Sequence, residues 1–373
     1  LSDRLHEELT KSFIDKRASV LARGLKQDIS FETKIENDGN VLINNQFIGN
    51  LKGLKLELDF KIGDLETDIK SLKKAARQNV SPEISKRINQ IIEGKQIELK
   101  EDRKIYWNNF PIAMLIKGSD YLSPELSLII DDIVENDEKF KLHSFLKKWL
   151  DTKIIDELDS LLKLKNINSV NAQIRALSYQ LYENNGVVKR EEVLNIIKNL
   201  SQDERKTLRN LGVKFGRYHI FLFKLFKPSV VSLRVLLWKN FNGEDLNLLP
   251  PTFGLNFVND NKYKNKKFML LCGFEKFDSF FVRIDILERL FIEIINSNEN
   301  KSDKIKLIPK MLNLLGCNKE SFIKVIKIMG YKVFDEKNET FFKYKPLKRI
   351  KKSLDLKIKK DNPFEALKQL DLK

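Results

Sequence analysis

The residues with the clearest chemical potential are lysines and arginines gathered near the end of the chain. Between Lys343 and Lys360, nine side chains are Lys or Arg and one, Asp355, is acidic, so nine minus one gives a net +8, half of the +16 of the whole sequence. Such a block attracts polyphosphate backbones, and the attraction weakens as salt rises. A solvated tail that only aids solubility is the alternative interpretation. The candidate phosphate-contacting residues of this block are Lys343, Lys348, Arg349, Lys351 and Lys352.

A second group of lysines lies on a segment expected to be helical, just before the basic block. From residue 319 to Met329 the apolar side chains Phe322, Val325 and Ile326 recur at helical spacing, and Gly330 ends the pattern. The lysines between them therefore point away from the core. The candidate nucleic-acid contacts on this helix are Lys319, Lys324 and Lys327.

The elements around this helix predict a module that would present the lysines. Helices are expected at 284–295 and 304–315, before the lysine-bearing helix, and a hairpin of 331–334 and 339–344 follows it. Three helices and a hairpin are typical of a winged helix, a variant of the helix-turn-helix that binds nucleic acid. A helix-turn-helix used only for protein contacts stays open as the alternative.

The longest apolar-rich stretch, 211–240, supplies weaker candidates. Ser201 and Glu204 predict a capping box for the helix before it, and Pro228 and Gly243 bound a helix after it. Val231, Val235 and Trp238 share one face of that second helix, whereas Arg234 and Lys239 lie off it. A buried helix pair is the plain interpretation. The basic residues of this stretch that could touch a phosphate backbone are Lys214, Arg217 and Lys227.

The motifs of the common enzyme classes are missing from the sequence. It has no G-x-x-x-x-G-K-[ST] phosphate loop, no DEAD-type acidic box, no G-x-S-x-G, no H-E-x-x-H and no C-x-x-C. The three histidines and two cysteines are scattered singly, without the spacing of a zinc site. No catalytic residue, metal ligand or cofactor is predicted within this chain, and whether it is an enzyme stays uncertain.

Length and composition predict several domains of class α+β, mainly helical. The 373 residues contain no run of 18 apolar residues and no signal peptide, so we expect a cytoplasmic protein without membrane contact. Because Leu1 is not methionine, we expect a fragment or processed piece of a longer chain. The expected divisions are a linking amphipathic helix at 1–30, two β-hairpin repeats at 31–123, a central helical domain at 124–243, a winged-helix-like module at 244–346, and a basic tail with a short terminal helix at 347–373.

The two hairpins are expected because a weak repeat occurs at an offset of 64 residues. Val41, Ile48 and Leu51 fall on Ile105, Ile112 and Leu115, and an Asn-Asn pair recurs in the bend. Asparagine tolerates the positive φ that such a bend requires. One hairpin shape used twice, with a helix between the copies, is the prediction.

Several blocks resemble the C-terminal region of a known helicase family. They are GVKFG at 212–216, HIF at 219–221, LFKP at 225–228, LRVLLW at 233–238, LHEELTKSFIDKRASVLARGL at 5–25, GFEKFDSFFVRIDILERL at 273–290, LLGCNKESFIKVIKIMGYK at 314–332 and NPFEALKQL at 362–370. The chain is similar to the alphaproteobacterial superfamily II helicases related to the mitochondrial degradosome RNA helicase. The resemblance implies two upstream RecA-like motor domains that use ATP and magnesium.

The resemblance and the basic residues together predict an accessory, nucleic-acid-binding C-terminal region of an ATP-dependent RNA or DNA helicase. Single-stranded nucleic acid, RNA favoured, is the expected partner. The alternative is a protein-interaction scaffold that recruits a nuclease or another partner to the helicase, through the winged helix and the terminal PFEAL helix.

Overall fold

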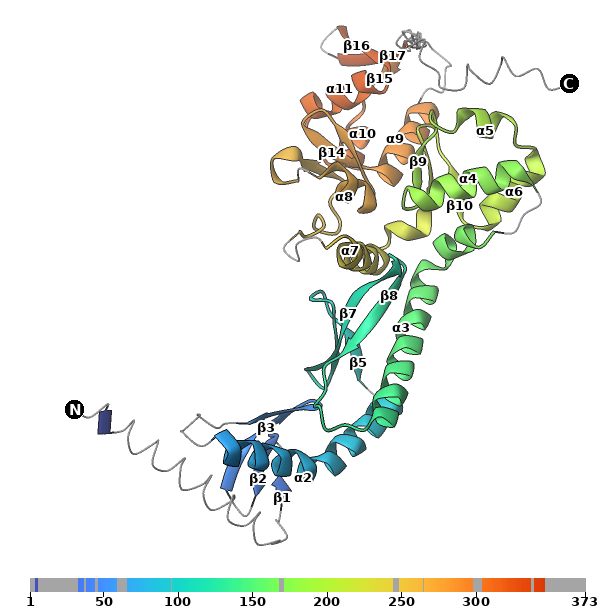
Figure 1. Ribbon diagram of the computed structural model, residues 1–373. Coiled ribbons are helices and arrows are strands. Elements are labelled where there is room, and N and C mark those ends of the chain that lie inside the picture. Colours follow the sequence, from blue (N-terminus) through green and yellow to red (C-terminus); the bar gives the residue numbers. More distant parts are fainter. Residues whose placement is uncertain are drawn as a thin grey trace, which may run out of the picture. The chain divides into compact units, whose positions relative to one another are not determined.

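The protein is described by a computed structural model (Figure 1), which shows an α+β chain. Its described residues form ten α-helices and five small antiparallel sheets. The expected α+β class is confirmed at this level.

The chain divides into two compact units, 1–291 and 292–373. The described residues are 4–5, 33–36, 38–43, 46–58, 66–94, 96–167, 171–243, 248–263, 265–297, 304–336 and 339–345. The expected basic tail, and the linking helix apart from residues 4 and 5, lie outside them.

The first unit opens with an antiparallel meander whose strands pair in chain order. At its first turn Gly39 adopts a φ of 91°, which favours glycine, and the Asp38 side chain accepts a hydrogen bond from the Asn40 N–H at 3.1 Å. Val41 and Ile48 are buried on one face. The strands are β1 (Thr33–Ile35), β2 (Asn40–Ile43), β3 (Gln46–Lys52) and β4 (Lys55–Leu58).

A second meander follows α2 (Glu66–Ile92), again with strands paired in chain order. Its turn resembles the first, since Asp102 accepts from the Lys104 N–H at 3.2 Å, as Asp38 does from Asn40. Each meander has a register irregularity in its second strand, between residues 41 and 42 and between 105 and 106. These positions are 64 residues apart. The strands are β5 (Ile97–Leu99), β6 (Lys104–Trp107), β7 (Phe110–Asp120) and β8 (Ser123–Leu128).

The next part of the first unit combines helices with a small sheet. The long helix α3 packs along β8, and the capping box of Ser201 and Glu204 is present at α6, as expected. A central helical domain was expected here, but this part also contains a small sheet of three short strands. The alternating, aromatic stretch 213–221 is typical of a strand, and two of the three strands form at 213–215 and 219–222. The elements are α3 (Asn136–Lys165), α4 (Ala172–Glu183), β9 (Val187–Lys189), α5 (Leu194–Lys198), α6 (Gln202–Asn210), β10 (Val213–Phe215) and β11 (His219–Leu222), with sheet order β10-β11-β9.

Helix α7 (Pro228–Asn242) is buried on more than one side. Pro228 stands in its first turn and Gly243 ends it at φ 68°, as expected. Val231 and Val235 pack in one apolar cluster, whereas Leu237 belongs to the main core of the unit. Arg234, which lies off the face of Val231 and Val235 as expected, is also fully buried. The helix is therefore covered on more than one side.

The remainder of the first unit is a second small sheet with a helix against it. The sheet has order β12-β14-β13, and α8 packs against β13. Buried phenylalanines, among them Phe274 and Phe281, join α7 and α8 in one cluster. The elements are η1 (Phe223–Phe226), β12 (Phe257–Asn259), η2 (Asp260–Lys262), α8 (Lys266–Leu271), β13 (Phe274–Phe277), β14 (Phe280–Arg283) and α9 (Ile284–Asn296), whose last residues belong to the second unit.

The second unit places two helices against a three-stranded sheet of order β15-β17-β16. A helix was expected over 304–315, but its first residues form a strand and the helix starts at Pro309, because proline fits the first turn of a helix and not its interior. The elements are β15 (Ile305–Lys306), α10 (Pro309–Leu315), α11 (Lys319–Ile328), β16 (Tyr331–Glu336) and β17 (Glu339–Tyr344). In the part of the chain that the structure describes, no helix is both long and apolar enough to cross a membrane.

Candidate nucleic-acid interface

Helix α11 carries three of the expected lysines on its outer face. Its start is fixed by Asn318, whose side-chain oxygen accepts a hydrogen bond from the Ser321 N–H at 2.9 Å. The inner face consists of Phe322, Val325 and Ile326, all buried as the helical spacing predicted. The lysines of the outer face, Lys319, Lys324 and Lys327, are exposed.

The ionic partners of these lysines differ. The Lys319 ammonium lies 3.8 Å from a carboxylate oxygen of Asp335, and both side chains are more than half exposed. Among the described residues, no carboxylate lies within 4.0 Å of the ammonium of Lys324 or Lys327. These two lysines stand one turn apart on the helix. They therefore form a compact positive site that protein carboxylates do not neutralise in the described part of the chain.

The hairpin of β16 and β17 has an inner apolar face and an outer face with lysines. Phe342 is buried and packs edge-on against the ring of Phe322 on α11, with ring centroids 6.2 Å apart. Because side chains alternate along a strand, its neighbours Phe341 and Lys343 point to the other side. The pairing there places Lys332 opposite Lys343 and Phe334 opposite Phe341.

Strand β15 extends this outer face with two more lysines. The Lys304 ammonium lies 2.5 Å from a Glu336 carboxylate oxygen and 5.1 Å from the centroid of the Phe334 ring. Lys306 forms an ion pair with Glu339 on the neighbouring strand. We call this face the outer sheet face; it consists of Lys304, Lys306, Lys332, Phe334, Glu336, Glu339, Phe341 and Lys343.

The other phosphate-contacting residues predicted from the sequence lie elsewhere in the chain. Lys214 on β10, Arg217 in the turn before β11 and Lys227 at the start of α7 are all exposed in the first unit. The Arg217 guanidinium lies 5.8 Å from the centroid of the Phe291 ring. Lys348, Arg349, Lys351 and Lys352 lie outside the described residues.

The first unit contains a buried polar cluster that was not predicted from the sequence. His219 Nε2 lies 3.3 Å from a carboxylate oxygen of Glu275, and its Nδ1 lies 3.6 Å from Glu288. Lys189, whose side chain is 45% exposed, contacts Glu275 at 2.9 Å from the edge of the cluster. The four residues come from β9, β11, β13 and α9, which are as much as 99 positions apart (288 minus 189). No local pattern could have revealed this cluster.

Electrostatics within this cluster favour charged side chains. Burial lowers the pKa of His219, but the carboxylates of Glu275 and Glu288 outweigh burial, and the pKa is raised above its usual 6.5. Burial raises the pKa of Glu275, yet His219 and Lys189 outweigh it, and that pKa is lowered. The Glu288 carboxylate accepts backbone N–H groups of the turn before β11, including those of Tyr218 and His219 at 2.8 Å. Its observed contacts thus fix a turn in the fold.

Arg234 is a second buried cation that the sequence did not predict. Its guanidinium donates to the carbonyl oxygens of Leu225 at 3.2 Å and Asn185 at 2.5 Å. Complete burial lowers the pKa of this arginine. Asn185 stands at a positive φ of 54°, in the turn before β9. Arg234 therefore ties that turn and η1 to α7.

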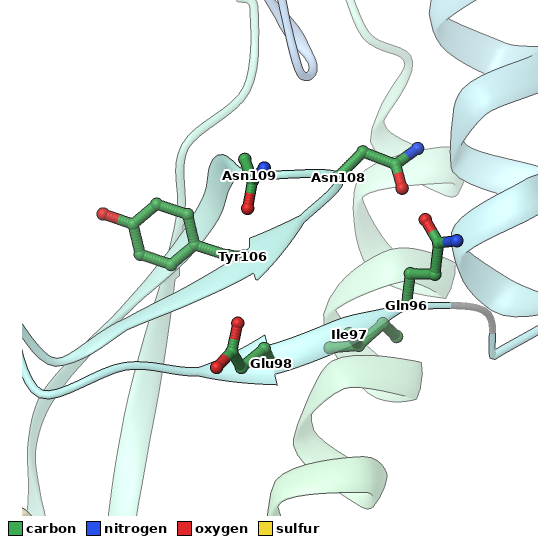
Figure 2. Close-up of a pocket in the computed structure, with 6 residues that line it drawn as sticks. All are labelled: Gln96, Ile97, Glu98, Tyr106, Asn108 and Asn109. Carbon is green, nitrogen blue, oxygen red and sulfur yellow. The ribbon is translucent and has the colours of Figure 1, made fainter.

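An open depression of about 460 Å³ lies beside the second meander (Figure 2). Glu98 supplies its single carboxylate, and the Tyr106 hydroxyl donates to Asp102 at 2.7 Å, a hydrogen bond that raises the pKa of Tyr106. Within the described residues, no three His, Cys, Asp or Glu side chains are grouped as metal ligands. The depression pairs no nucleophile with a base. It is lined by Gln96, Ile97, Glu98, Tyr106, Asn108 and Asn109.

Comparison of the chain with protein-family models, with curated proteins and with solved structures found no match. The interpretation of the lysine-bearing surfaces therefore depends on their own residues.

Proposed function

We propose that this chain is the accessory nucleic-acid-binding region of an ATP-dependent helicase whose RecA-like motor domains lie upstream. Its second unit binds the backbone of a single strand, preferably RNA, in the cytoplasm. ATP and magnesium belong to the upstream motor in this proposal. The observation that supports the proposal most directly is that α11 exposes Lys324 and Lys327. In the described part of the chain, no carboxylate lies within 4.0 Å of either ammonium group. Positive groups of this kind are available for phosphates.

The order of elements in the second unit supports a winged-helix-like module as part of this proposal. The last turns of α9, then β15, α10, α11 and the hairpin follow one another, and β15 pairs with the second strand of the hairpin. In a winged helix the third helix and the wing are the elements that reach nucleic acid. Here those elements are α11 and the hairpin of β16 and β17.

The meanders of the first unit are, in the same proposal, two copies of one module. Their matching strand order, turns and register irregularities at an offset of 64 residues support this. The Leu51 N–H donates to the carbonyl of residue 39 at 2.8 Å, and the Leu115 N–H donates to that of residue 103, also at 2.8 Å.

The test is binding of the full chain to a labelled single-stranded RNA across a salt series. Neutralising Z phosphates gives a slope of log affinity against log salt of about −0.7Z for single strands. The variant Lys324→Gln/Lys327→Gln should therefore flatten the slope by roughly 1.4. Lys141→Gln/Lys148→Gln, two exposed lysines of α3, is the matched control and should leave it unchanged. A wild-type affinity that does not depend on salt would contradict the proposal.

A protein-interaction scaffold is the second candidate, and one observation favours it. Ile292 and Ile295, three residues apart on α9, are 57% and 55% exposed. Exposed apolar pairs on one helix face suit contact with another protein, such as a nuclease. Retained binding of a partner nuclease by Lys324→Gln/Lys327→Gln, together with its loss in Ile292→Ser/Ile295→Ser, would support this role. If Ile292→Ser/Ile295→Ser still binds single-stranded RNA, nucleic-acid binding and partner binding are separate functions of the chain.

A further inference from the structure

The outer sheet face combines two aromatic rings with four lysines. Phe334 and Phe341 lie opposite each other in the register of β16 and β17. Their ring planes are within 14° of parallel, with centroids 6.3 Å apart. Neither ring is fully buried, whereas Phe342, on the other side of the same strand, is 1% exposed. The two phenylalanines thus occupy the side of the sheet away from the core.

The position of Lys304 shows which side of the partly exposed Phe334 ring lies near solvent. Its ammonium lies over this ring, 5.1 Å from the centroid, and its side chain is 51% exposed. A hydrated ammonium cannot occupy that position above a ring directed into a core. A flat, polarisable group arriving from solvent can therefore reach the same ring face if the exposed Lys304 side chain moves aside.

The charges around the rings select the occupant. Four lysines and two glutamates lie on the outer sheet face, which gives it a net charge of +2. Lys332 and Lys343 project side by side next to the phenylalanine pair, since their strands pair them directly. Side chains directly opposite on paired strands have Cβ atoms about 5 Å apart, so one phosphate can contact both ammonium groups. In a single strand each base lies next to a phosphate. A base can therefore stack on the phenylalanine rings while its phosphate contacts the paired lysines.

We infer that the outer sheet face is a stacking platform for unpaired bases, with Phe334 and Phe341 as the rings and Lys332 and Lys343 as the phosphate contacts. The inference rests on the proposed function and deepens it: the ligand is a single strand whose bases are free, because the bases of a duplex stack on one another and cannot stack on the two rings. Helix α11 then contributes charge, and the sheet contributes the distinction between single and double strands.

The experiment compares two oligomers of equal length and charge, an ordinary single strand and an abasic one, each bound by the full chain. Base stacking on aromatic side chains contributes enough that the wild type should bind the abasic oligomer at least about tenfold more weakly. In Phe334→Leu/Phe341→Leu the ratio should fall to nearly one, because only the phosphate contacts remain. Phe140→Leu, an exposed phenylalanine of α3, is the matched control and should keep the wild-type ratio.

A merely structural role of the phenylalanine pair would lower stability without changing the ratio. Thermal unfolding of each variant separates these cases, and the wild-type comparison of the two oligomers stands even if the double variant does not fold. Equal affinity of the wild type for both oligomers, with salt-dependent binding, would overturn the stacking platform and leave the proposed function intact. Binding to neither oligomer would overturn both.

Discussion

Lys332 and Lys343 lie directly opposite each other on paired strands and point to the same side of the sheet. Like charges in this arrangement destabilise a sheet. Two lysines facing one another therefore repel each other, and an anion lying between them would relieve this repulsion. Removal of one lysine of this pair should therefore raise stability and weaken the binding of an anion.

The variant Lys332→Thr tests these opposite effects on stability and on binding. Threonine suits a strand and removes the repulsion, so we expect the second unit to be stabilised by about 0.2–1 kcal/mol. The same change removes one phosphate contact and should flatten the salt slope of strand binding by about 0.7. The measurements are thermal unfolding and binding across a salt series. Lys55→Thr, which changes an exposed lysine of β4, is the control and should leave the salt slope unchanged. A Lys332→Thr protein that binds as strongly as the wild type would contradict the expectation.

The buried cluster around His219 predicts a pH dependence of stability. Because the pKa of His219 is raised in the fold, its contribution is fully present below pH 6.5 and is lost as pH rises through the raised value. The pKa of Glu275 is lowered, so its contribution is present above pH 4.5 and is lost as pH falls through the lowered value. The cluster should therefore stabilise the fold most between these two values.

Denaturant unfolding of the wild type and His219→Gln at several pH values checks this. The stability difference between them should be largest near pH 5.5 and should shrink as the solution becomes alkaline. His143→Gln, on α3, controls for the loss of an imidazole elsewhere. A difference that stays constant from pH 5 to 9 would show that His219 is not charged in the folded protein.

Glu288 predicts a large loss of stability on truncation. Its carboxylate accepts the N–H groups of Arg217 at 2.5 Å and of Tyr218 and His219 at 2.8 Å. Glu288→Ala leaves these donors without their acceptor and should cost roughly 2–4 kcal/mol of unfolding free energy. Asp156→Ala, an exposed carboxylate of α3, should cost far less. Equal unfolding midpoints for the two variants would refute the assignment.

Gly216 belongs to the same turn and shows how closely the chain approaches Glu288. A Cβ atom at this position would lie 2.4 Å from the Glu288 side-chain carboxyl carbon. The GVKFG block therefore needs its second glycine because a carboxylate fills the space that a side chain would occupy. Sequence reading identified the block without the residue that explains it.

The sequence by itself determined the local features of this protein. The capping box at α6, the limits of α7 and the inner face of α11 agree with expectation, because each depends on side chains within about one helical turn of one another. The start of α10 at Pro309 also follows from a local rule, although the broader helical pattern had hidden it.

Only the tertiary structure decided which charges are buried together and which rings lie on the side of the sheet away from the core. His219 meets Glu275 and Glu288 across 56 and 69 positions of the chain, and Arg234 is buried because both sides of its helix are covered. The role of Phe341 depends on the strand pairing that turns Phe342 inward. Contacts between distant segments depend on how the elements pack, and the spacing of residues along the chain carries no information about that packing.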